Sequence, residues 1–249
     1  MKYLIFILLS VILLSGFFLR FYAVGQIPAG FFADEAAIGY NAYKLLTTGK
    51  DEYNIPHPFY FRSFGDWRTP VPIYSMIPAV TIFGLNEFSV RLTMVAYGTA
   101  TILLLFLFTR ELFWKERLKN VIALASSLFL AISPWHIHFS RSGFEFTAMP
   151  FYLLGGLFFL FRFLRGTKDR DLILATIFFV ITFYTAYVVQ LVLIPYLFFI
   201  FILYFKTFQT KYKLFLFCLF IFMLGLIPFL FSSIHGQALT RFNSVSPIS

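Results

Sequence analysis

Two adjacent acids, Asp34 and Glu35, stand at the start of a short apolar run, where a carboxylate can take a proton from an incoming hydroxyl group. Aspartate is also a favoured residue at a helix N-terminus, and acids in the first helical turn offset the helix dipole. On the residues alone, this structural role as a cap is favoured over a catalytic one.

A second group of reactive side chains lies in the segment 62–70, which contains Arg62, Asp66, Trp67 and Arg68. The forked guanidinium group of arginine suits a phosphate, so these residues are candidates for binding a phosphorylated substrate. The alternative is an ordinary membrane anchor, in which Trp67 and Arg68 reach lipid headgroups. The residues of this segment leave both interpretations open: a phosphate-binding site and a membrane anchor.

A third group lies in the segment 133–145, which holds His136, His138, Arg141 and Glu145 in a short turn between two apolar runs. Ionisable groups at membrane depth are functional candidates, and we therefore keep Arg141 and Glu145 as candidate substrate-binding residues. The two histidines are two positions apart, which suits an extended chain better than one helix face. Because no zinc-ligand spacing accompanies them, we expect no metal centre here.

Other common chemistries lack their motifs. The sequence has no GxSxG, Walker or dinucleotide-binding glycine pattern, so acyl hydrolysis, nucleotide hydrolysis and hydride transfer are unsupported. Cys218 is the single cysteine, which excludes an internal disulfide. The basic residues are scattered over short segments without interleaved aromatic residues, so we expect no nucleic-acid partner.

The elements that must position these side chains are membrane helices. The chain is 60% hydrophobic and only 12% charged, which is more apolar than a soluble core of 249 residues can hide. We predict an all-α integral membrane protein with about seven transmembrane helices, the first of them retained rather than cleaved as a signal peptide. The predicted spans are near 4–24, 89–109, 120–138, 146–164, 171–189, 190–205 and 213–231.

Charge decides the orientation of these spans. The run Pro72–Leu85 is shorter than a usual span, but if it crossed the bilayer every later segment would change sides. The distribution of basic residues decides between the two, and we place the run at the membrane surface. The amino terminus and the loops near 110–119, 165–170 and 206–213 then share one side, with twelve of the twenty basic and four of the eleven acidic residues. By the positive-inside rule this side is cytoplasmic.

The segment 25–88 becomes a long outer loop rich in aromatic residues. Within it, the acids at 34 and 35 and the glycine at 49 predict a short helix with Ile38, Ala42 and Leu45 on one side. The polar tail 232–249 is also expected outside. We treat residues 1–249 as one transmembrane domain and expect it to be the N-terminal part of a longer protein.

The order of these segments resembles that of the GT-C membrane glycosyltransferases of the protein O-mannosyltransferase-like and aminoarabinose-transferase-like kinds. The similarity covers roughly residues 1–190. It rests on the segments Phe32–Ala36, Asp66–Tyr74, Phe83–Leu92, Ser133–Trp135 and Ser140–Glu145.

The resemblance implies transfer of a hexose or pentose from a polyprenyl-phosphate donor to a lipid, glycan or protein acceptor on the outer face of the plasma membrane. Asp34 matches the acid that opens the first outer loop, regarded as the catalytic base, and we take Glu35 beside it as a second catalytic candidate. Arg68 matches a basic residue that meets the donor phosphate. Glu145 approximates a second-loop acid, although the family often has a Pro-Asp pair where this chain has Phe144-Glu145.

The chemistry agrees with these residue types, because an inverting displacement needs a carboxylate opposite a departing phosphate and a cation to stabilise that phosphate. No cofactor is required by the sequence, and a divalent cation stays open. The resemblance favours activity of the longer protein over activity of this fragment alone. The alternatives are a polytopic transporter or lipid flippase without transferase activity, and a non-catalytic membrane scaffold.

Overall fold

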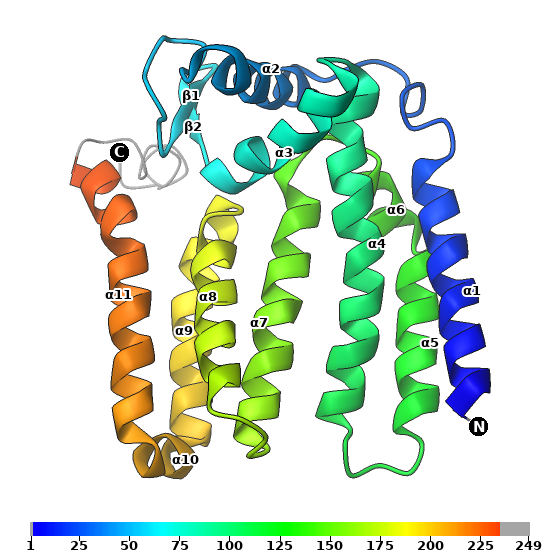
Figure 1. The fold of residues 1–249 in the computed structure, drawn as a ribbon, viewed down its shortest axis with the longest axis vertical. Helices are drawn as coiled ribbons and strands as arrows, with labels where there is room; N and C mark the ends of the chain where they lie inside the picture. The colour runs from blue at the N-terminus through cyan, green and yellow to red at the C-terminus, as the bar shows by residue number, and fades with distance from the viewer. Residues whose placement is uncertain (1, 235–249) are drawn as a thin grey trace, which may run out of the picture.

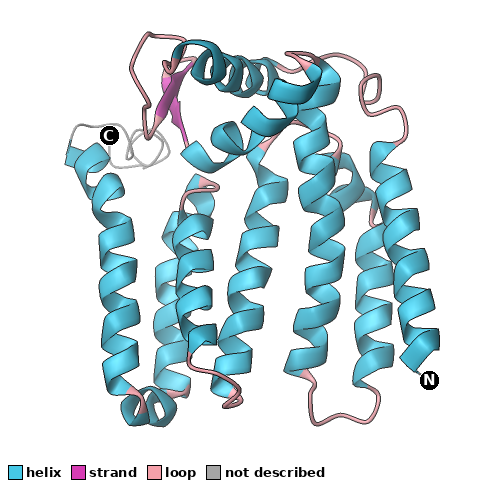
Figure 2. Cartoon of the chain, viewed as in Figure 1, coloured by secondary structure: helices cyan, strands magenta, loops and turns pink. Residues whose placement is uncertain are grey.

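The computed structural model describes residues 2–234, and most of the predicted tail 232–249 lies outside this range. Apart from one short hairpin, the regular secondary structure of the described residues is helical (Figure 2). The elements are α1 (Lys2–Phe21), α2 (Ala33–Thr48), β1 (Phe61–Ser63), β2 (Asp66–Arg68), α3 (Pro70–Phe83), α4 (Glu87–Leu112), α5 (Lys119–Ile132), α6 (Pro134–Ser140), the 3-10 turn η1 (Glu145–Thr147), α7 (Ala148–Leu164), α8 (Arg170–Phe183), α9 (Tyr187–Leu203), α10 (Phe205–Thr210) and α11 (Tyr212–Ile234).

The long helices stand side by side as a bundle, with α2, α3 and the hairpin lying across one end and α10 at the other (Figure 1). Helix α4 packs against α1, α5 and α7, while α8 packs against α7, α9 and α11. The all-helical membrane architecture expected from composition is confirmed. We call the end that carries α2 and α3 the outer end.

Four helices are long and apolar enough to cross a bilayer by themselves, namely α1, α4, the η1–α7 unit and α11. A fifth span results if α5 and α6 are counted as one bent unit. Helix α9, with 17 residues, and α8, with 14, stand in the same bundle but are shorter. The predicted number of seven spans is therefore not confirmed by length and composition.

Three predicted spans have the wrong boundaries. The run 120–138 is not one helix, because the chain bends by 61° between Ile132 and Pro134 and continues as α6. Proline cannot continue the hydrogen-bond ladder of α5, but it suits the first turn of a new helix. The predicted boundary between residues 189 and 190 is also wrong, since α8 ends at Phe183 and α9 begins at Tyr187.

The short helix predicted within the segment 25–88 is confirmed as α2, which lies across one end of the bundle (Figure 1). Ile38, Ala42 and Leu45 are all buried on its inner side. Gly49 ends the helix in the left-handed conformation with φ 68°, which costs glycine little because it has no Cβ. The segment predicted to lie at the surface is α3, which packs on α2 and α4.

The opposite end of the bundle carries the basic segments. The start of α1, the α4–α5 and α7–α8 loops and α10 all lie there (Figure 1). Salt bridges tie this end together, with Arg165 Nη1 2.9 Å from Glu111 Oε1 and Arg162 Nε 3.3 Å from Asp171 Oδ2. The separation of basic loops from the long loop 25–88 is thus confirmed.

Candidate active site

Three of the predicted site residues meet at the outer end of the bundle. The Arg68 guanidinium lies between two carboxylates: Nη2 donates a short hydrogen bond to Asp34 Oδ1, and Nη1 is 3.6 Å from Glu145 Oε2. Arg68 and Glu145 are buried, whereas the Asp34 side chain is 42% exposed. We call these three residues the acid–arginine cluster. They come from α2, β2 and η1, which are far apart in sequence.

The hairpin β1–β2 delivers Arg68 to the cluster. Its two strands pair Phe61 with Arg68 and Ser63 with Asp66, and the turn is formed by Phe64 and Gly65. Both turn residues have positive φ, 49° and 82°, as in a type I′ turn, whose twist matches that of a two-stranded hairpin. Arg68 ends the second strand just before α3 begins.

The strand–helix junction after Arg68 is fastened to the turn between α8 and α9. Thr69 Oγ1 donates to the Thr185 carbonyl at 2.9 Å, and the Val71 amide donates to the Tyr184 carbonyl at 3.3 Å. Next to it, the Tyr60 hydroxyl accepts from Gln190 Nε2 at 3.2 Å. Burial raises the pKa of Tyr60, so the hydroxyl stays protonated. These contacts fix the position of Arg68 relative to the helix bundle.

The structure separates Asp34 from the capping role that the sequence favoured. Helix α2 has Phe32 as its N-cap, and Asp34 is the second helical residue. The acid that reaches back to the helix end is Glu35, whose Oε2 accepts from the Phe32 amide at 3.2 Å. Asp34 is therefore not the N-cap, although it lies in the first turn of α2, where an acid offsets the helix dipole. Its carboxylate pairs with Arg68.

Glu35 lies in a buried ion pair with Arg91 of α4. Arg91 Nε is 3.1 Å from Glu35 Oε1 and Nη2 is 3.2 Å from Oε2, and both side chains are fully buried. Arg91 also donates to the carbonyls of Val24, Pro28 and Gly30. Together these bonds hold the chain before α2 against the bundle.

Glu35 also contacts the loop that carries Glu145, because Oε1 accepts from the Gly143 amide. A Cβ at Gly143 would lie 2.8 Å from Val90 and 3.3 Å from Glu35, so only glycine allows this approach. The contact sets the distance between α2 and η1. Both carboxylates around Arg68 therefore depend on Glu35 for their position.

The other two predicted residues of the hairpin lie apart from the cluster. Arg62 is exposed and stacks over the Tyr53 ring at 5.3 Å. Because side chains alternate along a strand and Phe61 is opposite Arg68, Arg62 points to the other face of the hairpin. Asp66 is half-buried, and its Oδ1 accepts from the Trp67 amide at 2.8 Å.

Arg141 is buried beside the end of α1 rather than in the cluster. Its guanidinium donates to the carbonyls of Leu19, Tyr22 and Ile27 at 2.8, 2.7 and 3.1 Å. Burial, with a smaller contribution from the positive charge of Arg91, lowers the pKa of Arg141. Its geometry is that of a helix cap, and it gives no support to the predicted substrate contact.

The predicted extended turn at the histidines is wrong. His136 and His138 lie on helix α6, where His136 is buried and His138 is exposed. Arg20 Nη2 donates to His136 Nδ1 at 2.8 Å, and Arg20 also donates to the carbonyls of Leu130 and Ala131 at the end of α5. His136 therefore helps hold the α5–α6 bend. Within residues 2–234 no cluster of histidine, cysteine and acidic side chains forms a metal site.

The family comparison identifies a membrane glycosyltransferase of the GT-C type, and the all-helical fold is consistent with this class. The chain matches the family model of the dolichyl-phosphate-mannose-protein mannosyltransferases over residues 68–231, well over half of its length, and so belongs to that family. Comparison with curated proteins and with solved structures gave no match. The matched range includes Arg68 and Glu145 and begins after Asp34.

Sequence reasoning missed two residues that hold the cluster. Arg91 lies within a predicted span, and an ionisable side chain there is a functional candidate by default, which was the available signal. Gly143 gave no signal, because the crowding that requires glycine appears only when α2, α4 and the 140–145 loop are packed together.

Proposed function

We propose that this protein transfers a sugar from a polyprenyl-phosphate donor to a glycan, lipid or protein acceptor at the outer face of the plasma membrane, with inversion at the sugar carbon. The observation that carries the proposal is the acid–arginine cluster: one buried arginine between two carboxylates, at the end of the bundle opposite the basic loops. The family match favours mannose as the sugar.

Asp34 acts as the general base in this proposal. Its carboxylate is accessible, and the ion pair with Arg68 uses one oxygen, Oδ1. The acceptor hydroxyl gives its proton to Asp34 while its oxygen forms the new bond to the anomeric carbon, and the bond to the phosphate oxygen breaks on the opposite side. The leaving group is the polyprenyl phosphate, which carries the displaced electron pair.

Arg68 stabilises the departing phosphate. Its contact with Glu145 is the looser of its two ion pairs, at 3.6 Å, so the phosphate takes the place of Glu145 at Nη1. Glu145 holds the guanidinium in position before the donor binds. Glu35 and Arg91 do not meet the substrate in this scheme, because both are fully buried and bonded to each other.

The test is sugar transfer by the full-length protein in proteoliposomes, with radiolabelled polyprenyl-phosphate mannose and the membrane glycan, lipid and protein fractions as acceptors. Transfer that Arg68→Ala abolishes supports the proposal. Movement of the intact labelled donor across the bilayer without transfer would support the flippase alternative and contradict ours.

Orientation is tested separately in the background Cys218→Ser, which removes the single native cysteine. We expect Arg117→Cys to be inaccessible to an impermeant thiol reagent in intact cells, since the basic loops lie in the cytoplasm. Asn54→Cys, in the outer loop, is the matched control and should react. Labelling at position 117 and protection at 54 would invert the topology.

A further inference from the structure

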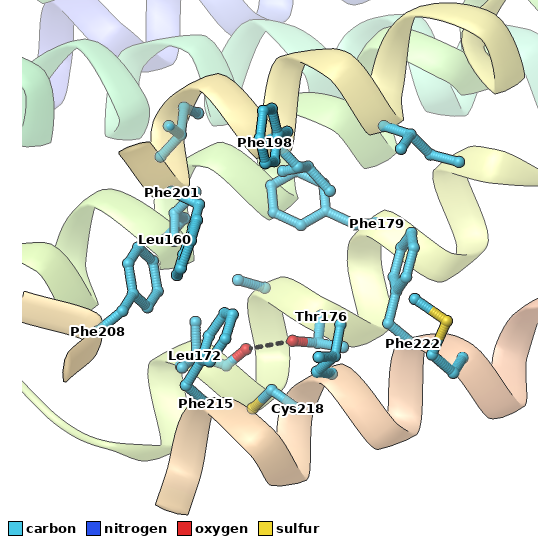
Figure 3. Close-up of a pocket in the computed structure, with 16 residues that line it drawn as sticks. Leu160, Leu172, Thr176, Phe179, Phe198, Phe201, Phe208, Phe215, Cys218 and Phe222 are labelled. Carbon is cyan, nitrogen blue, oxygen red and sulfur yellow. Dashed lines mark hydrogen bonds between the residues drawn. The ribbon is translucent and has the colours of Figure 1, made fainter. Parts of the chain in front are cut away.

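An apolar cavity of about 500 Å³ lies between α7, α8, α9 and α11 (Figure 3). Its volume is in the range of ligand-binding pockets. Phe208 of α10 contributes to the lining, which places the cavity at the end of the bundle away from the acid–arginine cluster. The sugar-transfer scheme leaves this cavity unused.

The lining excludes water as the natural occupant. All sixteen lining residues are apolar except Thr176 and Cys218. The Thr176 hydroxyl already donates to the Leu172 carbonyl at 2.9 Å, the bond drawn in Figure 3. A buried water needs two to four polar partners, whereas apolar cavities of this kind stay dry and take apolar ligands. The occupant that fits is a hydrocarbon chain.

The cavity opens sideways towards the bilayer. Helix α8 packs against both α9 and α11, whereas α9 and α11 have little direct contact with each other and are joined by α10. Phe198 of α9 and Met223 of α11 line the cavity and are 63% and 52% exposed. A lipid tail can therefore enter between α9 and α11 without any helix moving aside.

The charge beside this opening is positive. The segment 187–234 contains no acidic residue, and its three lysines, Lys206, Lys211 and Lys213, lie in or next to α10. Lys211 is 3.1 Å from Asp169. Lys206 and Lys213 are exposed and have no ion pair within residues 2–234. Lysines at the end of a membrane helix bundle attract anionic lipid headgroups.

We propose that the cavity binds one acyl chain of an anionic phospholipid of the inner leaflet, with its headgroup at Lys206 and Lys213. The same short helix that supplies Lys206 supplies Phe208 to the cavity, so headgroup and chain are recognised together. The site is independent of the sugar donor, because it lies at the opposite end of the bundle.

The experiment uses the full-length protein in nanodiscs and phosphatidylglycerol with a photoreactive diazirine near the end of one acyl chain. Phosphatidylcholine with the same chains is the matched lipid. Peptide mass spectrometry should find the label concentrated on 215–223 and on 194–201, with about fivefold less labelling from the zwitterionic lipid for each lysine that the headgroup meets.

Three variants sharpen the test. Lys206→Gln with Lys213→Gln should remove the preference for the anionic lipid, whereas Lys119→Gln, at the start of α5, should keep it. Met223→Trp at the mouth should abolish labelling of Cys218 while the protein elutes as wild type in size exclusion. Labelling spread evenly over α1 and α11, equal labelling by both lipids, or an unlabelled Cys218 in folded wild-type protein would overturn the proposal. The last result would mean that another segment of the chain fills the cavity.

Discussion

Asp34 and Glu35 are neighbours in sequence, and each is paired with an arginine, yet their surroundings differ. Glu35 is fully buried against Arg91, which donates to both of its oxygens. Asp34 is 42% exposed and contacts Arg68 through one oxygen. The difference teaches that an acid–arginine pair is not by itself a sign of catalysis. In the proposed mechanism, solvent exposure and a spare oxygen distinguish the pair that reacts from the pair that only holds the fold.

Helix geometry explains how adjacent acids reach such different places. Successive residues of an α-helix are about 100° apart around the axis, so the two side chains leave α2 in different directions. The contacts of Glu35 with Phe32 and Gly143 then fix the rotation of the helix. Glu35 therefore sets the direction in which the proposed base, Asp34, points.

The largest expected effect is on folding, from Glu35→Gln. The substitution keeps the shape of the side chain but leaves the Arg91 charge buried without its partner, and we expect a loss of about 3–5 kcal/mol in the free energy of unfolding. Thermal unfolding of the detergent-solubilised protein measures it. The matched control is Glu87→Gln, which removes the exposed partner of Arg91 at 3.5 Å and should cost less than about 1 kcal/mol. Equal stability of both variants would contradict the structural role of Glu35.

The next effect separates the two functions of Arg68. Arg68→Ala removes the cation and should lower transfer by about a hundredfold. Arg68→Lys keeps the charge, but a single ammonium group cannot contact Asp34 and a phosphate at the same time as the two arms of a guanidinium can. We therefore expect the transfer rate to fall by about tenfold, mostly because the donor binds more weakly. Initial rates across donor concentrations distinguish the two. Wild-type rates in both variants would remove Arg68 from the site.

The smallest effect is expected at Arg62, on the other face of the hairpin. Arg62→Ala removes a contact with Tyr53 that is exposed to solvent. We expect the transfer rate to stay within about twofold of wild type, because exposed cation–π contacts stabilise by less than about 1 kcal/mol. A loss as large as that of Arg68→Ala would show that substrate binds both faces of the hairpin.

Much of the fold followed from local rules in the sequence. The stop signal at Gly49 and the spacing of Ile38, Ala42 and Leu45 predicted α2 correctly, because helix ends and amphipathic faces are set by nearby residues. The bend at Pro134 was missed because apolar content alone does not distinguish a straight span from a broken one. Hydrophobicity predicts which segments lie within the membrane. It does not predict where a helix bends, which depends on backbone geometry.

The cluster itself was predicted only as separate residues. Asp34, Arg68 and Glu145 were each named, but their meeting depends on the hairpin register, which places Arg68 opposite Phe61. It also depends on the Glu35–Gly143 bond, which joins residues 108 positions apart in sequence. Arg141 looked similar to Arg68 in the sequence and lies instead at the end of α1. Residue type identified the candidates, and packing selected among them.

The most direct test of the account is sugar transfer by Asp34→Asn in the full-length protein, measured per folded molecule with a radiolabelled polyprenyl-phosphate donor. Asparagine keeps the size of the side chain and one oxygen that can accept from Arg68, but it carries no charge and cannot take the acceptor's proton. Asp34 does not cap α2, so the helix end is unaffected. We predict a rate at least about a hundredfold lower. The free energy of unfolding should fall by less than about 1 kcal/mol, because Asp34 is partly exposed and Glu145 still pairs with Arg68. Wild-type turnover by a folded Asp34→Asn protein would contradict the assignment of Asp34 as the base.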